Sequence, residues 1–204
     1  MGKITTEGEL RAIYGSASGR AVEKEFDRLD QHSRKFIEHS PLVLLGSDDG
    51  AGSADVTPKG DPAGFVEVID DRTIAIPDRP GNNRLDTWVN LLKNPAIGLL
   101  FLVPGMNEIL RINGQAEIRD DDALRQKFAI KDRLPATVLV VKIRQVYFHC
   151  AKALVRSKLW EPDKHIDRSI FPSLGQILKD QVAAKSDVDT SSWDTSDKYI
   201  KTLY

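Results

Sequence analysis

The chain has 204 residues, of which 41% are hydrophobic and 29% are charged, a composition typical of one soluble globular domain with a sizeable core. Its formal net charge of -1 gives no field that would hold nucleic acid or an anionic membrane, so we expect neither as a partner. A single cysteine, Cys150, excludes an internal disulfide and a multi-cysteine zinc site, and it fits a reducing, cytoplasmic location.

The first forty residues carry helix signals. Thr6 and Glu9 fit a capping box, the reciprocal pair that satisfies free backbone N–H groups at a helix start. Asp30 is a second candidate N-cap, within a charged segment (residues 20–39) whose apolar positions predict one or two amphipathic helices. We therefore expect three parts: an N-terminal helical extension (residues 1–40), a core (residues 41–160), and a C-terminal helix and tail (residues 161–204).

The middle of the chain is rich in short apolar or alternating runs bounded by turn residues, a pattern that predicts strands. One strong helix candidate, residues 84–93, interrupts these runs. This order suits a small antiparallel barrel better than a repeating βαβ sheet. The strand candidates are residues 42–45, 53–58, 65–69, 73–76, 96–103, 108–118 and 137–147.

Helix signals return after the last strand candidate. Residues 151–160 predict a short helix or turn, and residues 173–184 predict a terminal helix that Ser173 caps. The tail beyond them is polar but carries three aromatic residues, Trp193, Tyr199 and Tyr204. Because exposed aromatic surface is a liability, we expect this tail to pack on the domain or on a partner subunit.

The stretch after the fourth strand candidate has the features of an anion site. Pro77 cannot continue a central strand, and a turn follows it. Asn83 is a good N-cap and Asp86 fits its acidic partner, so we expect a helix to open at Arg84 with its free N–H groups facing the loop. Arg79 and Arg84 flank this helix end. Backbone donors, the helix dipole and two guanidinium groups together suit a phosphate.

The run Arg-Pro-Gly-Asn-Asn-Arg at residues 79–84, between an apolar strand and a helix, resembles the pyridoxamine 5'-phosphate oxidase-like family of FMN-binding split barrels. In particular, it is similar to a bacterial branch of FMN-dependent flavoproteins. Residues 65–77, 111–116 and 152–160 resemble the same branch, and the whole resemblance spans residues 36–160. It implies a mainly β fold with peripheral helices: a six-stranded antiparallel split β-barrel, in a homodimer that buries FMN at its interface.

The resemblance implies a set of phosphate ligands. In the family the FMN phosphate lies against the loop and helix start that match residues 79–87, so Arg84 is the first expected ligand and Arg79 the second. Thr87 lies one turn further on and can point its hydroxyl back at a phosphate, although a threonine bonded to its own helix fits equally well. Asn83 is a further candidate, either as a ligand or only as a cap.

Four other residues are implied to lie near the flavin ring. Lys59 follows a strand that resembles the one beneath the flavin, where a lysine commonly reaches the phosphate or the ring edge. A lone loop lysine is otherwise a solvated charge. Backbone groups of Val56 and Thr57 would face the edge of the isoalloxazine, and Pro77 would border the ring.

The segment with Arg156 and Trp160 approaches the flavin from the neighbouring subunit in the resembled family, whereas a tryptophan there is otherwise a hydrophobic anchor. We expect an FMN-dependent oxidoreductase with a small-molecule substrate and an electron donor or acceptor, in which no catalytic side chain is required. The alternatives are a non-catalytic flavin carrier or sensor, and a relative that binds another anion. A deazaflavin cosubstrate would need a longer basic groove. No metal site, P-loop or dinucleotide fingerprint is expected.

Overall fold

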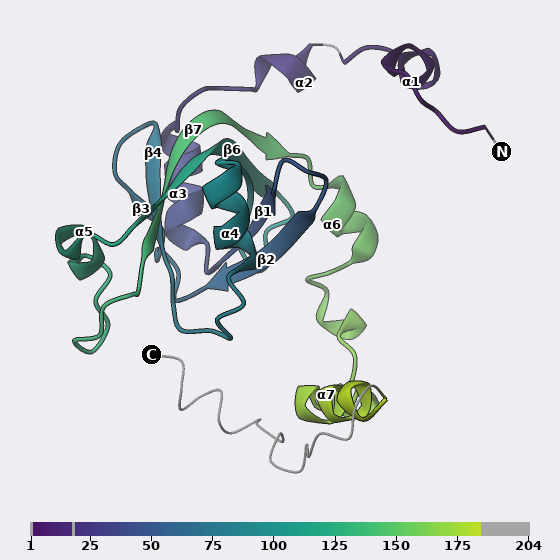
Figure 1. Ribbon diagram of the computed structural model, residues 1–204. Helices are drawn as coiled ribbons and strands as arrows, with labels where there is room; N and C mark the ends of the chain where they lie inside the picture. Colours follow the sequence, from purple (N-terminus) through teal and green to yellow (C-terminus); the bar gives the residue numbers. More distant parts are fainter. Residues whose placement is uncertain (1, 18, 185–204) are drawn as a thin grey trace.

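The computed structural model describes residues 2–17 and 19–184, and its centre is one sheet of seven strands in which every pairing is antiparallel (Figure 1). The strand order is β2-β1-β5-β6-β7-β4-β3. The strands are β1 (Leu42–Asp48), β2 (Ala54–Gly60), β3 (Glu67–Val68), β4 (Thr73–Pro77), β5 (Ala96–Leu102), β6 (Ile109–Arg119) and β7 (Val138–His149). The expected packing of Trp193, Tyr199 and Tyr204 lies outside the described residues.

The prediction of a mainly β, antiparallel fold with peripheral helices is confirmed, and each strand candidate overlaps an observed strand. The sheet has seven strands rather than six, because the two residues of β3 pair with β4 through Glu67↔Ala75 and Val68↔Ile74. Strands β2 and β3 form the two ends of the order. Pro58 lies in β2, where an end strand tolerates the missing N–H group.

The sheet curls around a hydrophobic core, against which α3 (Gln31–His39) and α4 (Asp86–Lys93) pack (Figure 1). The alternation of each strand decides which residues enter this core: Val43 and Leu45 of β1 are fully buried, while their neighbours are partly exposed. Although α3 belongs to the segment assigned to the N-terminal extension, it contributes core residues. The helices add Phe36, Ile37, Trp88 and Leu91, which pack against strand residues such as Leu99, Phe101, Leu110, Ile112, Leu139 and Val141.

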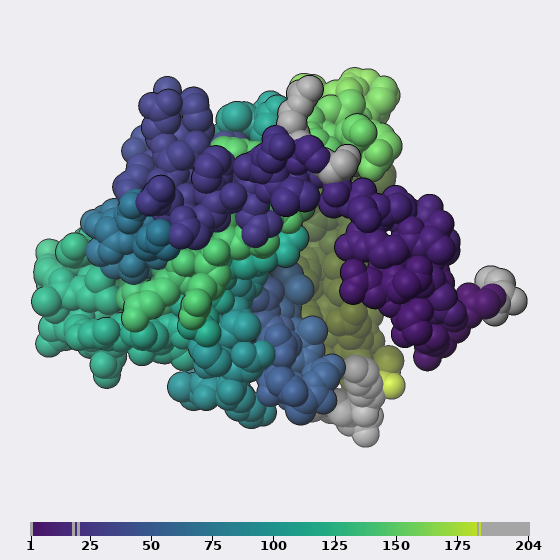
Figure 2. Space-filling model, turned by 90° about the horizontal axis from the view of Figure 1, so that it is seen from above, coloured from purple at the N-terminus to yellow at the C-terminus, as the bar shows by residue number. Residues whose placement is uncertain are grey.

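Three predicted helix starts are confirmed at Thr6, Asp30 and Ser173, whose side chains each accept from a backbone N–H in the first turn. Helix α1 (Glu7–Tyr14) has the full capping box but buries no residue, and both views show it projecting from the body in purple (Figure 1, Figure 2). None of the helices that the structure describes is long and apolar enough to span a membrane. Besides α1, α3 and α4, the described helices are α2 (Arg20–Glu23), α5 (Asp122–Gln126), α6 (Lys152–Ser157) and α7 (Leu174–Ala183). Two 3-10 turns lie at Pro162–Lys164 and Arg168–Ile170.

The longest strand pair, β6 with β7, contains an irregularity at Gly114. The register shifts between Asn113 and Gly114, where the ladder accommodates a bulge. A Cβ atom at Gly114 would lie 2.4 Å from the carbonyl oxygen of Lys142 and 2.9 Å from a methyl group of Val141. The close approach of two backbones therefore requires glycine at this position.

We expect Gly114→Ala to destabilise the fold by about 3 kcal/mol, because the added methyl group overlaps backbone that cannot move without breaking the ladder. Urea denaturation followed by circular dichroism measures this change. Gly46→Ala is the matched control, since a Cβ there would meet its nearest atom, the Gly98 carbonyl oxygen, at an ordinary 3.8 Å. Equal midpoints for the two variants would contradict the assignment.

Candidate functional site

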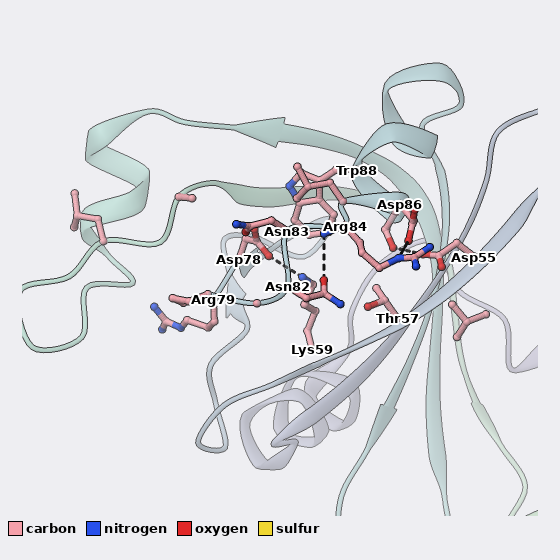
Figure 3. A pocket seen from close by; sticks show the side chains of 17 residues that line it. Asp55, Thr57, Lys59, Asp78, Arg79, Asn82, Asn83, Arg84, Asp86 and Trp88 are labelled. Atoms are coloured by element: carbon pink, nitrogen blue, oxygen red, sulfur yellow. Dashed lines mark hydrogen bonds and ion pairs between the residues drawn. The ribbon is translucent and has the colours of Figure 1, made fainter. Parts of the chain in front are cut away.

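A cavity of about 510 Å³ opens between β2, the loop of residues 78–85, the start of α4, and a second loop that contributes Leu134 and Ala136 (Figure 3). It contains the stretch that the sequence predicts to be an anion site. Seven of the predicted cofactor-binding residues line the cavity and come from two separate segments: Val56, Thr57, Lys59, Arg79, Asn83, Arg84 and Thr87.

The cavity lies where the two ends of the curled sheet approach each other. β2 is at one end of the strand order, and the loop of residues 78–85 follows β4, near the other end. Two ion pairs join these ends: Lys59 Nζ lies 2.7 Å from an Asp78 oxygen, and Arg79 Nε lies 2.6 Å from an Asp61 oxygen. Because β2 and β4 are not neighbours in the described sheet, side chains rather than a backbone ladder bridge this split.

Strand β2 brings three polar side chains to the cavity. Asp55, Thr57 and Lys59 occupy every second position and are all half-buried, so they share one face of the strand. Val56 borders the cavity from the other face, with 71% of its surface exposed. The strand thereby places polar groups in the cavity and an apolar side chain beside it.

Lys59 is positioned by two contacts. Its ammonium group donates to Asp78 and lies 4.3 Å from the centroid of the Trp88 ring. The indole is held in turn, because its Nε1–H donates to Thr137 Oγ1 at 3.0 Å. An ion pair and a cation–π contact together restrain a side chain that is otherwise flexible. The lysine is therefore directed to the cavity, and only 21% of its side chain is exposed.

The predicted start of α4 is wrong by two residues. The helix begins at Asp86, its N-cap is Leu85 with a left-handed φ of 60°, and no side chain caps it. Asn83 lies two residues before this N-cap, also with a left-handed φ, 57°, and does not cap the helix. The capping box fails because the Asp86 carboxylate accepts from Arg84 Nε at 2.7 Å instead of reaching back to the backbone. Two strained non-glycine residues in one loop are typical of ligand sites.

Arg84 is the most exposed of the three described cations that line the cavity. Its side chain is 74% exposed and pairs with Asp86, while its backbone N–H donates to Asn82 Oδ1 at 3.1 Å. The hydrogen bond and charge of Asp86 raise the pKa of Arg84 further above its usual value, so the guanidinium stays charged. Exposed ion pairs are weak. Arg84 can therefore exchange Asp86 for another anion.

Arg79 is turned away from the other two cations. Its Nε pairs with Asp61, whose side chain is only 1% exposed, and its Nη1 donates to the carbonyl oxygen of Phe128 at 2.7 Å. Figure 3 shows its guanidinium pointing away from Lys59 and Arg84. The expected contact of Arg79 with a phosphate stays a prediction, whereas its contacts here join the two ends of the sheet.

The side chain of Thr87 is not bonded to the backbone of its own helix, and its expected contact with a phosphate stays a prediction. Its hydroxyl donates to the carboxylate of Asp55, and the residue is buried at 3% exposure. This hydrogen bond ties α4 to β2. A hydroxyl that donates to Asp55 is not available as a donor to a phosphate until that bond is exchanged.

The charges of the cavity balance. Three carboxylates line it, and each is engaged: Asp55 by Thr87, Asp78 by Lys59, and Asp86 by Arg84. With Arg79 as the third cation, the formal charges of the lining sum to zero. Within residues 2–17 and 19–184, no group of three or more His, Cys, Asp or Glu residues is placed to hold a metal ion.

Three predicted site residues do not line the cavity. Pro77 ends β4 opposite Val138. Arg156 is exposed on α6, and the Trp160 indole donates to the carbonyl oxygen of Met106 at 2.8 Å. The last two residues were expected to act on the cavity of a neighbouring subunit, so their assignment stays a prediction.

Several lining residues were missed from the sequence. Asp55 carried a signal, because it lies two residues before Thr57 on the same strand and therefore faces the same side. Trp88 carried no signal beyond its place in the helix candidate at residues 84–93. Leu134 and Ala136 carried no signal, since a loop whose path is set by packing brings them to the cavity.

A second cavity, of about 480 Å³, adjoins the first and shares Arg79, Pro80 and Leu134 with it. Arg125 and Arg133 also line this second cavity, and none of its lining residues in the described part of the chain is acidic. Three arginines from segments distant in the sequence thus meet at this cavity, with Arg79 in an ion pair with Asp61 and Arg125 in an ion pair with Asp122.

We expect Asp61→Ala to destabilise the protein by about 3 kcal/mol, because it leaves the largely buried Arg79 guanidinium without its carboxylate and loosens the bridge between the sheet ends. Chemical denaturation measures the loss. Asp86→Ala is the control, since it removes a carboxylate from the exposed pair with Arg84 and should leave the midpoint nearly unchanged. A larger loss in the control would contradict this role for Asp61.

Comparison with known proteins gives two results. The family model described as pyridoxamine 5'-phosphate oxidase matches residues 29–150, and no curated protein matches the chain. Solved structures resemble it at low identity. HupZ of Group A Streptococcus is 19% identical with a TM-score of 0.47, and the match covers 59% of this chain and 93% of HupZ.

Two further structures are similar to the same extent. One is a Clostridium acetobutylicum protein related to general stress protein 26, of the pyridoxinephosphate oxidase family (17% identity, TM-score 0.45, covering 58% of this chain and 85% of that one). The other is an FAD-binding protein of Mesorhizobium loti (15% identity, TM-score 0.42, covering 59% and 94%). Likenesses at this level carry no argument about activity. Because the family model matches more than half of the chain, the protein belongs to the pyridoxamine 5'-phosphate oxidase family.

Proposed function

We propose that the first cavity binds FMN and that the protein is an FMN-dependent oxidoreductase. The observation that carries the proposal is that Lys59, Arg84 and the loop of residues 78–85 meet around one cavity in a chain of this family. Both cations form strong charge-assisted hydrogen bonds with a phosphate. The volume of about 510 Å³ lies within the range of small-molecule and cofactor sites.

Phosphate binding in this proposal is an exchange of ion-pair partners. Arg84 gives up Asp86 at little cost, because that pair is exposed to water. Lys59 and Asp78 are 21% and 16% exposed, so their pair is harder to break, and Lys59 acts mainly through its charge. Arg84 is therefore the first ligand of the phosphate, and Lys59 supports it.

FMN, when bound, supplies the transfer of one or two electrons at its ring. The chain anchors the phosphate, orients the ring and excludes water. We assign the ring edge to the backbone of Val56 and Thr57, which line the cavity on β2, and to Pro77, which immediately precedes the lining residue Asp78. No side chain serves as an acid or base in this proposal.

We further propose that two copies of the chain complete the site. Val56 on β2 is 71% exposed, and Val89 and Leu92 on α4 are 47% and 78% exposed, so both of these contacting elements, which contribute residues to the cavity, also expose apolar side chains. A second subunit would cover this surface. It would also bring Arg156 and Trp160, which lie outside the cavity of their own chain, to the flavin of its partner.

The adjoining cavity is our proposed position for the substrate. Arg79, Arg125 and Arg133 favour a molecule with a phosphate or carboxylate group, and the shared lining places such a molecule next to the flavin. The arginines restrict the class of substrate without naming it.

Arg84→Ala should weaken FMN binding by about 10- to 100-fold, since it removes a charge-assisted hydrogen bond to the phosphate. Quenching of flavin fluorescence in a titration measures the dissociation constant. Arg119→Ala is the matched control, because Arg119 is an exposed arginine that pairs with Asp121 outside the cavity.

Asp86→Asn should have the opposite effect in the same titration, because it removes both the competing partner of Arg84 and a negative charge near the phosphate. We expect FMN to bind about threefold to tenfold more tightly. If both substitutions leave FMN binding unchanged, the phosphate does not bind at this helix start and the proposal fails.

Turnover separates an oxidoreductase from a carrier or sensor. The purified protein should show the absorbance of oxidised flavin, lose it on anaerobic addition of a reduced nicotinamide, and regain it repeatedly with an added acceptor. Tightly bound flavin that is never reduced would instead support the non-catalytic alternative. The absence of any flavin binding would exclude both.

A further inference from the structure

A second group of cations lies on the outer face of β6 and β7, away from both cavities. Arg111 and Tyr147 are opposite each other in the register, and Arg111 Nη1 donates to the Tyr147 hydroxyl at 2.9 Å. Lys24 Nζ lies 4.9 Å from the centroid of the Tyr147 ring, Arg111 Cζ lies 5.4 Å from it, and the His149 ring centroid lies 5.2 Å away. We call Lys24, Arg111, Tyr147 and His149 the Tyr147 cluster.

The two cations of the Tyr147 cluster have no carboxylate partner among the residues that the structure describes. Lys24 donates to the carbonyl oxygen of Phe148 at 2.6 Å, and Arg111 donates to Tyr147 and, at 3.3 Å, to Asn113 Oδ1. Both side chains belong to half-buried residues. Cations that lose part of their hydration are normally paired with acids, and no ion pair within the described residues balances these two.

The environment of His149 is consistent with a net positive charge at the Tyr147 cluster. Burial, together with the positive charges of Arg111 and Lys24, lowers the pKa of His149 below its usual value. Among the described residues, Lys24 from the end of α2 and Arg111 from β6 act on this imidazole through their charges, and Tyr147 from β7 contacts its ring. A negative charge at the cluster would act in the opposite direction and raise the pKa.

The Tyr147 cluster differs from the proposed flavin cavity in how its cations are paired. There, Lys59 pairs with Asp78 and Arg84 pairs with Asp86, so the lining is neutral before any ligand binds. At the Tyr147 cluster the corresponding carboxylate is missing from the described residues, and the donors are held by neutral groups. The two sites share no residue.

We propose that the Tyr147 cluster is a binding site for a small anion, either a free oxyanion such as phosphate or the phosphate or carboxylate group of a small molecule. Arg111 and Lys24 supply two positive charges, and the Tyr147 hydroxyl and the His149 ring supply further donors. The proposal does not depend on flavin binding, because none of these residues lines the flavin cavity.

The test uses the full chain, titrated with inorganic phosphate at constant ionic strength while the imidazole signals are followed by NMR. We expect phosphate to raise the pKa of His149. The imidazole signals of His32 and His39, which lie on α3, are internal controls that should not respond to phosphate. Acetate in place of phosphate distinguishes the sources: a response to both identifies a general anion site, and a response to phosphate alone identifies a phosphate site.

Arg111→Gln should weaken phosphate binding by about tenfold, since one charge-assisted interaction is lost. Lys24→Gln is a second variant that leaves the β6–β7 ladder intact. The matched control is Arg144→Gln, which removes an exposed arginine of β7 that contacts Gln115 on the same strand pair. Flavin binding should be equal in all three variants.

Two results would overturn the proposal. One is a pKa of His149 that phosphate and acetate do not change. The other is a loss of self-association in Arg111→Gln, measured by sedimentation, without any change in phosphate binding. That result would mean that a carboxylate of a second copy of the chain, rather than a small anion, pairs with these cations. Failure of flavin binding in the wild-type protein would affect only the proposed function.

Discussion

The contact between Lys59 and Asp78 governs the architecture of the candidate site. It joins an end strand of the sheet to the loop that follows β4, and Arg79 with Asp61 makes a second such bridge. Both pairs are largely withdrawn from water, so their attraction is stronger than that of surface pairs. The split of the barrel is thus held by charges, and the cavity exists because the two ends meet without forming a ladder.

The sequence was sufficient for the fold where the pattern is local. Apolar or alternating runs and the breaks at turn residues located every described strand. The caps at Thr6, Asp30 and Ser173 were correct because each acts within one helical turn. It was not sufficient for α4. Asn83 and Asp86 have the right types and spacing for a capping box. In the structure, however, the Asp86 carboxylate accepts a hydrogen bond from Arg84, and no side chain caps the helix. Local signals cannot tell which of two neighbouring partners a carboxylate selects.

The sequence predicted which cations lie at the candidate site, but it did not predict which carboxylates contact the site residues. Lys59 and Arg84 follow from the anion-site pattern and the family resemblance, and the structure brings them to one cavity. Asp55, which binds Thr87, and Asp61, which binds Arg79, come from other segments, so their contacts depend on tertiary folding. The roles of Lys59, Arg79 and Arg84 depend on such partners, and the Tyr147 cluster differs from the cavity because its two cations have no carboxylate partner among the described residues.

Pro58 gives the end strand β2 a further property. A strand at the end of a sheet offers unpaired N–H and C=O groups to any extended chain, and this leads to unwanted strand addition and aggregation. Proline in such a strand directs its missing donor outward, so the row of hydrogen bonds that an added strand would need is interrupted next to Lys59. A protein that covers this side of the cavity would therefore contact it mainly through side chains, and Pro58 disfavours an added strand as the cover of the cavity.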